Sequence, residues 1–520
     1  MKGKSKPPWI TWRRLSQVLF LLLFFILFIK TDYNGTDEIP YAVNILFRID
    51  PLVAAAAMLA AKAVIAILLP ALIVVALTLL LGRAFCGWLC PMGALIDFCR
   101  RWIRPRANQP RPGLRRIKYV LLALVLTGAF FGLPVVGYFD PFSILVRGFA
   151  TSVYPAANGA VTEFFTVTYK SAPAWVNAVT EPLYALLKAT ILPFKQKLFT
   201  LSLLSLAMLL AVFALEKLER RFFCRNLCPL GALLALNSWF SLMRGRAADT
   251  RCGDCRLCER ICRMNAIDGE KRISPEACIL CMECVDRCPQ EKIAFGFDRP
   301  APKPAFAGMP RRTFVAALVS GAVLPAFLKT RTIAAVPPPE LVRPPGALPE
   351  PEFLGRCVRC AECMQVCIGN ALHPAFLEAG MEGVFTPRLM ARVGYCEYNC
   401  TLCGQVCPTG AIRPLPLAEK QKTVIGLAII DKNTCLPFAK GVPCIVCEEH
   451  CPTPDKAIKF RMATVLNERG ESVRVKQPYV IDRLCIGCGI CETRCPVAGR
   501  SAIVVTSAGE SRHPEIGGGY

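Results

Sequence analysis

Histidine is scarce in this 520-residue chain, which contains only His373, His450 and His513. All three lie outside the long apolar runs, which excludes a bis-histidine haem inside a membrane. The chain also lacks a Cys-x-x-Cys-His motif, so covalent c-type haem is excluded. Neither a phosphate-binding glycine motif nor a nucleophile elbow is present. Iron-sulfur chemistry is what remains for the 29 cysteines.

The chain is too apolar for a soluble protein of its size, with 54% hydrophobic residues and a mean hydropathy of +0.41. A helix that crosses a bilayer needs roughly 20 apolar residues. Four runs approach or reach that length, near residues 15–30, 63–82, 118–138 and 199–215. We therefore predict an α-helical membrane domain of four spanning helices, in contact with membrane lipid.

The net charge of +24 falls largely beside the apolar runs, which indicates membrane orientation and not nucleic-acid binding. Basic residues precede the first run and are frequent in the connection between the second and third runs. In residues 31–51, by contrast, four of the five charged residues are acidic. By the positive-inside rule this places the N-terminus in the cytoplasm of a bacterial inner membrane. The basic residues are Lys2, Lys4, Lys6, Arg13 and Arg14, then Arg83, Arg100, Arg101, Arg104, Arg106, Arg111, Arg115, Arg116 and Lys118.

The membrane part contains an internal repeat. The segment 85–95, Phe-Cys-Gly-Trp-Leu-Cys-Pro-Met-Gly-Ala-Leu, recurs at 223–233 as Phe-Cys-Arg-Asn-Leu-Cys-Pro-Leu-Gly-Ala-Leu. Upstream, Asp50-Pro51 corresponds to Asp140-Pro141, so the four helices are two copies of one hairpin. The second copy carries an insertion at about 151–196, which this topology places in the periplasm.

Each repeat contributes a Cys-x-x-x-Cys-Pro motif at a predicted cytoplasmic helix end. Proline suits the first turn of a new helix, so Pro91 and Pro229 mark breaks between helices. The four motif cysteines could hold a seventh iron-sulfur centre, form a redox-active thiol pair, or pack without a redox role. They are Cys86, Cys90, Cys224 and Cys228; Cys99 has no partner of matching spacing and is interpreted as structural.

Two further groups of four cysteines have the spacing C-x2-C-x2-C-x3-C and lie between residues 252 and 288. In bacterial two-cluster ferredoxins, three thiolates of one group and the last thiolate of the other hold each [4Fe-4S] cluster. This pattern predicts crossed ligand sets, although Arg263 stands where proline usually follows the fourth cysteine. The predicted sets are Cys252, Cys255, Cys258 with Cys288, and Cys278, Cys281, Cys284 with Cys262.

Four more groups lie after residue 351, and together the six groups predict six [4Fe-4S] clusters. Disulfide frameworks do not show such regular short spacings. We favour a nested pairing of the third group with the sixth and the fourth with the fifth, because the middle two share irregular spacing; sequential pairing would use the same ligands. The groups are Cys357, Cys360, Cys363, Cys367; Cys396, Cys400, Cys403, Cys407; Cys435, Cys444, Cys447, Cys451; and Cys485, Cys488, Cys491, Cys495. His450 is interpreted as a surface residue or an outer-shell neighbour of its group.

A proline-rich linker separates the two cysteine-rich parts. Within it, Arg311-Arg312 directly precede the apolar stretch 313–328, as in a twin-arginine export signal; a fifth span is the alternative. The expected domains are 1–245 in the membrane, 246–296 as a cytoplasmic two-cluster ferredoxin, 297–350 as linker, 351–505 as a periplasmic four-cluster ferredoxin, and 506–520 as a disordered tail. The ferredoxin parts are expected to have an α+β fold.

These motifs resemble a known pair of proteins, the membrane ferredoxin of periplasmic nitrate reductase systems (NapH type) and its exported partner (NapG type, akin to MauM). The first resemblance covers about 10–300, and the second covers about 309–510, including the segment 343–349, Arg-Pro-Pro-Gly-Ala-Leu-Pro. It implies electron transfer from menaquinol or ubiquinol, as substrate, to a periplasmic cytochrome or reductase. The chain departs from the pair by fusing them and by carrying the 151–196 insertion.

Three hypotheses follow from the sequence. The first is a quinol-dehydrogenase-type electron carrier, in which Asp50 and Asp140 either accept quinol protons or, as we prefer, act as helix N-caps. The second is a transmembrane wire fed by a cytoplasmic ferredoxin through the first two groups. The third is an assembly or redox-maintenance factor that uses the membrane cysteines as thiols.

Overall fold

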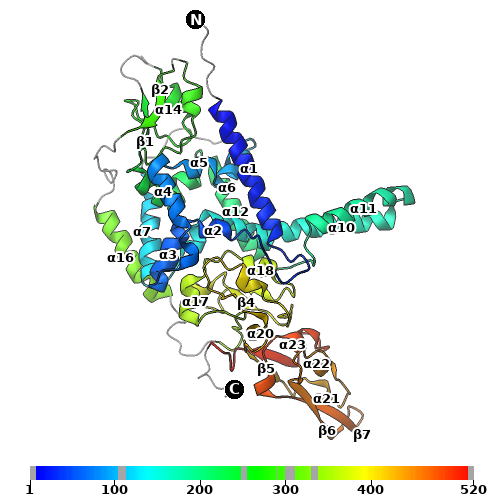
Figure 1. Cartoon of the computed structure of the whole chain (residues 1–520). Coiled ribbons are helices and arrows are strands. Elements are labelled where there is room, and N and C mark those ends of the chain that lie inside the picture. Colours follow the sequence, from blue (N-terminus) through cyan, green and yellow to red (C-terminus); the bar gives the residue numbers. More distant parts are fainter. Residues whose placement is uncertain are drawn as a thin grey trace. The chain divides into compact units, whose positions relative to one another are not determined.

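The computed structural model describes residues 8–103, 113–247, 255–289, 291–298, 311–328 and 338–512. The chain divides into two compact units (Figure 1), each built from three separate segments. Unit 1 comprises residues 1–28, 43–148 and 203–325, and unit 2 comprises 29–42, 149–202 and 326–520. The predicted membrane domain 1–245 is therefore shared, because its 29–42 and 149–202 segments belong to unit 2.

Unit 1 is mainly helical. Its helices are α1 (Trp9–Lys30), α2 (Ile45–Arg48), α3 (Pro51–Ala61), α4 (Ala71–Leu81), α5 (Ala84–Trp88), α6 (Pro91–Cys99), α7 (Ile117–Phe130), α8 (Val136–Phe139), α9 (Pro141–Gly148), α12 (Ser202–Ala214), α13 (Pro229–Ser238), α14 (Leu257–Ile261), α15 (Glu283–Asp286) and α16 (Arg311–Leu328). Strands β1 (Met243–Ala247) and β2 (Ile293–Phe297) pair antiparallel around the two-cluster ferredoxin segment. The last residues of α1 and α16 pass into unit 2.

Proline starts the helices of both repeats, as predicted. Pro51 and Pro141 begin α3 and α9, and Pro91 and Pro229 begin α6 and α13. Asp50 is the N-cap of α3, since its Oδ1 accepts hydrogen bonds from the amides of the second and third helical residues. Asp140 likewise accepts from Ser143 N at 2.7 Å. The preferred interpretation of both aspartates as N-caps is confirmed.

By length and composition, one helix of the described residues could cross a membrane, and it is α1. The remaining apolar helices, which include Pro51–Ala61, Ala66–Leu81, Pro229–Ser238 and Arg312–Phe327, are shorter. Each predicted spanning run overlaps a helix, α1, α4, α7 or α12. The sequence predicted the start of α3 at Pro51 but not its packing with α7 and α13 in the interior of unit 1.

Unit 2 consists of two long helices, α10 and α11, several short helices, three antiparallel two-stranded sheets and an isolated bridge. Its helices are α10 (Tyr154–Ser171), α11 (Ala174–Thr190), α17 (Glu350–Arg356), α18 (Glu362–Val366), α19 (Leu402–Gln405), α20 (Leu417–Lys420), α21 (Leu436–Ala439), α22 (Val446–Glu449) and α23 (Ile490–Arg494). Its strands are β3 (Leu372–Pro374), β4 (Pro387–Leu389), β5 (Leu427–Ile430), β6 (Ile458–Leu466), β7 (Ser472–Val480) and β8 (Ile503–Thr506), paired β3–β4, β5–β8 and β6–β7. Ala347 bridges to Ile412.

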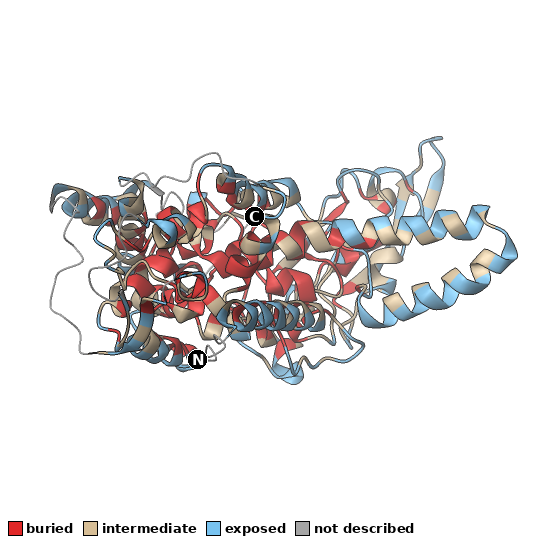
Figure 2. Ribbon diagram, turned by 90° about the horizontal axis from the view of Figure 1, so that it is seen from above, coloured by how far each residue is buried: buried red, intermediate tan, exposed pale blue. Residues whose placement is uncertain are grey.

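The predicted insertion forms the hairpin of α10 and α11, most of which is exposed (Figure 2). The expectation of disorder from Thr506 onward does not hold for residues 506–512. Thr506 ends β8, and the Arg512 guanidinium pairs with Glu510 and Glu350. Although burial opposes it, the guanidiniums of Arg343 and Arg512 lower the pKa of Glu350 to about 2. Residues 513–520 lie outside the described part of the chain.

The 29–42 segment is fastened to the cysteine-rich part of unit 2. The Asp37 carboxylate accepts hydrogen bonds from the amide and the hydroxyl of Thr401, both at 2.7 Å. Gln405 donates to the Asp37 carbonyl at 2.7 Å and accepts from Ile39 N. Ala42 completes a small apolar core with Val366 and Leu402.

We predict that Asp37→Ala loosens this segment locally by about 1–3 kcal/mol, because two hydrogen bonds to a charged acceptor are lost. Hydrogen exchange of residues 31–42 should accelerate in the variant. The matched control is Glu38→Ala, which removes an exposed neighbouring carboxylate and should leave exchange unchanged. Equal exchange in both variants would contradict the assigned role of Asp37.

Candidate iron-sulfur sites

In unit 1 the last cysteine of each group lies with the first cysteines of the other group, as predicted for crossed ligand sets. Burial and the nearby thiols of Cys281, Cys278 and Cys262 raise the pKa of Cys284. We name these four cysteines site B. A second cavity is lined by Cys255, Cys258 and Cys288 and is named site A; Cys252, its predicted fourth ligand, lies outside the described residues.

In unit 2 the groups pair sequentially, third with fourth and fifth with sixth. Cys357, Cys360, Cys363 and Cys407 line one cavity, named site C. The thiols of Cys396, Cys400 and Cys367 surround Cys403 and, with burial, raise its pKa well above the ordinary value; these four form site D. The nested pairing that we favoured from the sequence is therefore wrong.

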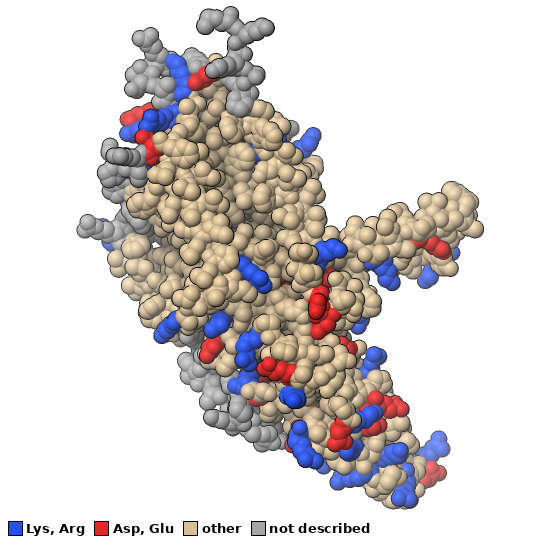
Figure 3. Space-filling model, viewed as in Figure 1, with Lys and Arg blue, Asp and Glu red and all other residues tan. Residues whose placement is uncertain are grey.

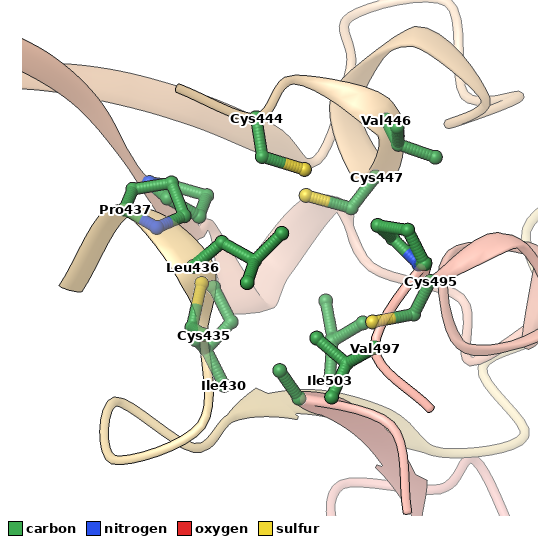
Figure 4. A pocket seen from close by; sticks show the side chains of 13 residues that line it. Ile430, Cys435, Leu436, Pro437, Cys444, Val446, Cys447, Cys495, Val497 and Ile503 are labelled. Carbon is green, nitrogen blue, oxygen red and sulfur yellow. The ribbon is translucent and has the colours of Figure 1, made fainter. Parts of the chain in front are cut away.

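The fifth and sixth groups form the last two sites. Cys435, Cys444, Cys447 and Cys495 line the cavity named site F, and their sulfurs converge on it (Figure 4). Cys451 and Cys485 are electrostatic neighbours of Cys488, and Cys485 and Cys488 are neighbours of Cys491. These four form site E. His450 is exposed and its Nδ1 lies 3.0 Å from the Val446 carbonyl oxygen.

The backbone turns left-handed at two places in each regular group of unit 2 and in the second group of unit 1. The residues just before and just after the second cysteine have positive φ, as at Leu280 (52°) and Met282 (58°) around Cys281. The same pair is Arg359 and Ala361, and then Gly487 and Gly489. Non-glycine residues rarely adopt this conformation outside functional sites. Spacing alone did not predict these turns.

Backbone amides donate to several of the sulfurs. Ala266 N donates to Cys262 Sγ at 3.2 Å, Ala371 N to Cys367 Sγ at 3.3 Å, and Ile412 N to Cys407 Sγ at 3.4 Å. In each case the donor follows the last cysteine of a group by four or five residues. Hydrogen bonds to sulfur and solvent exposure are among the protein features that tune the reduction potential of an iron-sulfur cluster.

The four motif cysteines of the repeats meet, which the sequence could not establish. Burial and the thiols of Cys224, Cys86 and Cys90 raise the pKa of Cys228 well above its ordinary value. We name this set site M. Burial raises the pKa of Cys224 to about 12, against the opposing effect of the Arg221 guanidinium.

In each repeat an arginine lies three residues before the first motif cysteine, and its side chain contacts the other repeat. Arg221 of the second repeat donates to the carbonyls of Cys86 and Gly93 in the first, both at 3.2 Å. Arg83 of the first repeat reaches Gly231 of the second, where a Cβ would lie 3.0 Å from its guanidinium nitrogen. Both arginines are buried. Site M therefore has cationic groups at two symmetry-related positions.

The two-cluster ferredoxin is docked directly against site M. Cys86 packs against the small apolar cluster of Met264, Ile279 and Cys281, the last of which belongs to site B. Trp88 Nε1 donates to the Leu280 carbonyl at 2.9 Å. Gly87 is indispensable to this approach, since a Cβ there would lie 2.2 Å from the Ile279 carbonyl oxygen. Site M and site B are thus neighbours.

A buried ladder of charges secures the docking. Arg263 pairs with Asp97 at 2.7 Å and with Glu283 at 2.5 Å. Asp97 also pairs with Arg221, and Glu283 pairs with Arg13 of α1. Burial by itself would raise the pKa of Asp97, but the Arg221 and Arg263 guanidiniums bring it well below its usual range. The arginine that replaces the usual proline after Cys262 therefore joins the ferredoxin to the repeat motif.

The donor sets fit iron-sulfur clusters. Buried thiols with raised pKa values stay protonated at neutral pH unless a metal replaces the proton. Within the described residues no group of three or more Cys, His, Asp or Glu side chains is arranged to hold a single metal ion. Instead, the thiols of sites A, C and F are spaced around cavities.

Comparisons with known proteins agree with this chemistry. A family described as "4Fe-4S binding domain" matches residues 63–110 and 198–246, the two repeats that supply site M. The ferredoxin-type protein MauM of Methylorubrum extorquens is 36% identical over 192 residues, 36% of this chain and 80% of the relative. NapG of Escherichia coli is 38% identical over 158 residues, 30% of this chain and 65% of the relative. No solved structure matches.

A further relative is Protein NirI of Paracoccus denitrificans, 32% identical over 205 residues, 39% of this chain but only 24% of NirI. Fold, cysteine sites and relatives together define a ferredoxin-type iron-sulfur protein. The chain belongs to the family of MauM and NapG ferredoxin-type proteins.

We predict that Gly87→Ala weakens the docking of the ferredoxin, because the added methyl group displaces the Ile279 backbone. Limited proteolysis should then release the segment after residue 247 faster than in the parent protein. Gly269→Ala is the matched control, since its Cβ would meet nothing within 4 Å. Identical cleavage rates in the two variants would contradict the contact.

Iron content tests the sequential pairing. Cys360 and Cys407 both belong to site C, so Cys360→Ala with Cys407→Ala should remove about four irons, as either single variant does. Cys396→Ala with Cys407→Ala affects sites C and D and should remove about eight. The nested arrangement would give about eight for the first double variant.

Proposed function

We propose that this protein carries electrons from quinol in the bacterial inner membrane to a redox partner in the periplasm. Sites A to F each hold one [4Fe-4S] cluster, and site M holds a seventh iron-sulfur centre. Iron-sulfur clusters supply one-electron exchange without bond making or breaking in the protein. The names of the relatives, ferredoxin-type proteins, support an electron-transfer role.

The sorting of segments between the units carries this proposal. The segments predicted to be periplasmic, around 31–51 and 151–196, mainly share unit 2 with the four-cluster part. The motifs predicted to be cytoplasmic share unit 1 with the two-cluster part. Segments far apart in the sequence are thus grouped by the side of the membrane that charge distribution assigns to them.

Specific contacts support the placement of sites C to F in the periplasm. Lys197, next to the predicted fourth span, pairs with Asp32, which follows α1, at 2.5 Å. Lys197 also donates to the carbonyl of Gln365, which lies between Cys363 of site C and Cys367 of site D. Lys197, at the end of the second predicted periplasmic segment, therefore links Asp32, at the start of the first, to the loop around Gln365.

Helix α1 supports the two-sided arrangement. At its first turn, Ile10 N donates to Asp286 and the Arg13 guanidinium pairs with Glu283, both in the two-cluster ferredoxin. At its other end α1 leads directly into the 31–42 segment of unit 2. Between these ends runs the helix that is long and apolar enough to cross a bilayer. After the three further predicted spans, near 63–82, 118–138 and 199–215, the chain crosses again at α16, as a fifth span or an export signal.

A second candidate donor is a cytoplasmic ferredoxin that delivers electrons to site A. The observation that favours it is the exposure of Cys255, which lines site A. A cluster near the surface exchanges electrons readily with a soluble protein. Site M, docked against site B, would in that case serve only to connect the ferredoxin with the membrane.

We predict that menaquinol reduces the purified protein anaerobically and that electron paramagnetic resonance detects reduced clusters. Dithionite reduction of the same sample sets the full signal and serves as the control. A protein that dithionite or a reduced ferredoxin reduces, but menaquinol does not, would contradict the quinol proposal and select the second candidate.

A further inference from the structure

Site F lies at the end of a series of neighbouring sites in unit 2. Cys396 N of site D donates to the Cys488 carbonyl of site E at 2.8 Å. Site E in turn adjoins site F, because Cys491 of site E lies close enough to Cys447 of site F for their thiols to interact electrostatically. The 29–42 and 192–202 segments bind at the other end, around Gln365 and Thr401. An electron that passes from D through E therefore reaches F last.

The surface beside site F is open and apolar. Val442 and Ile445 flank Cys444 and are 43% and 39% exposed. The corresponding neighbours of Cys360 in site C, Val358 and Ala361, are each only 3% exposed. Among these two sites, F is the one whose ligand loop is accessible to a partner protein.

The long interval between Cys435 and Cys444 connects site F to the β6–β7 hairpin. The interval forms α21, which packs on β7, and Gly441 lies against Val473 and Val465. Strand register places these two valines opposite each other on one face of the β6–β7 hairpin. That face is the inner one, so the other face of the hairpin points outward.

The outward face of the hairpin starts at site F and carries apolar and basic side chains. Pro478 lines the site F cavity, and its strand partner is Phe460. Next along the same face are Met462 opposite Lys476 and Thr464 opposite Arg474. Met462 is 50% exposed, and Lys476 lies over the Phe460 ring at 5.9 Å.

The two basic side chains on this face have no ion-pair partner within the described residues. Nearby acidic groups are already engaged, since Glu468 pairs with Lys440 and Glu471 accepts from Asn467. Lys and Arg side chains lie over the end of unit 2 that carries β6 and β7, with Asp and Glu side chains among them (Figure 3). Aromatic residues, methionine and arginine are enriched in protein–protein interfaces, and unpaired positive charge attracts an acidic partner.

We propose that the outward face of the β6–β7 hairpin, formed by Phe460, Met462, Leu466, Arg474 and Lys476, is the docking surface for a soluble redox protein whose contact face is acidic. The proposal rests on the electron-transfer function proposed above and names the chemistry of the partner. One electron leaves the reduced cluster of site F, which becomes oxidised, and the one-electron centre of the partner is reduced. No proton or bond is transferred.

Stopped-flow electron transfer tests the proposal with the full-length protein in neutral detergent, reduced by dithionite and freed of excess reductant. The acceptors are the soluble haem domain of cytochrome b5, as an acidic probe, and mitochondrial cytochrome c, as a basic one. Arg474→Glu with Lys476→Glu should slow the acidic probe at least about tenfold at low ionic strength and accelerate the basic probe, and high salt should abolish both effects.

Arg413→Glu with Lys422→Glu is the matched control, because both residues are exposed in unit 2 and away from the hairpin. It should leave both rates near those of the parent protein. Iron content and the reduced cluster spectrum establish that all variants are folded. Equal rates in the hairpin variant and the control would overturn the proposal.

Vesicles that contain anionic lipid distinguish a protein partner from a membrane surface. Loss of vesicle binding in the hairpin variant, with unchanged rates toward both cytochromes, would also overturn the proposal in favour of a lipid contact. Because dithionite replaces quinol in these measurements, failure of quinol to reduce the protein would leave this test intact. The two proposals can therefore fail separately.

Discussion

The structure depends on the convergence of four thiols from two cysteine groups at one site. Each of sites B to F takes three cysteines from one group and the last cysteine of its partner group. The two chain segments that carry a pair of groups are therefore joined at both sites of the pair. Few other elements could do this, because the helices of unit 2 around the sites have four to seven residues and the sheets have two strands. Metal binding of this kind supplies folding free energy as well as function.

A second constraint acts where the two-cluster ferredoxin meets the repeats. The ladder from Arg13 through Glu283, Arg263 and Asp97 to Arg221 is almost entirely buried. Buried ion pairs seldom stabilise more than apolar packing would, but removing one partner costs about 3–5 kcal/mol. The ladder therefore specifies one docking geometry, in which Cys86 packs against the cluster of Met264, Ile279 and Cys281. Arg263 is central to that geometry, because it pairs with both Asp97 and Glu283.

Much of this organisation was predictable from the sequence, for physical reasons. Spacing fixed the cysteine groups, and the Asp-Pro and Cys-Pro pairs marked the starts of α3, α6, α9 and α13. The nested pairing failed because the irregular intervals have local causes: the fifth group contains α21, which packs on β7, and in the fourth group Lys420 binds the carbonyls of Glu397 and Tyr398. The meeting of the repeats at site M and the docking of Arg263 are tertiary contacts, which no local pattern encodes.

The most direct measurement is the iron and acid-labile sulfide content of the full-length protein prepared without oxygen. Six clusters require about 24 of each per chain, and a seventh centre at site M adds up to about four more. We expect values in that range, with negligible zinc. A far lower iron content, or cysteines joined as disulfides, would contradict the assignment of these thiol sets to iron-sulfur clusters.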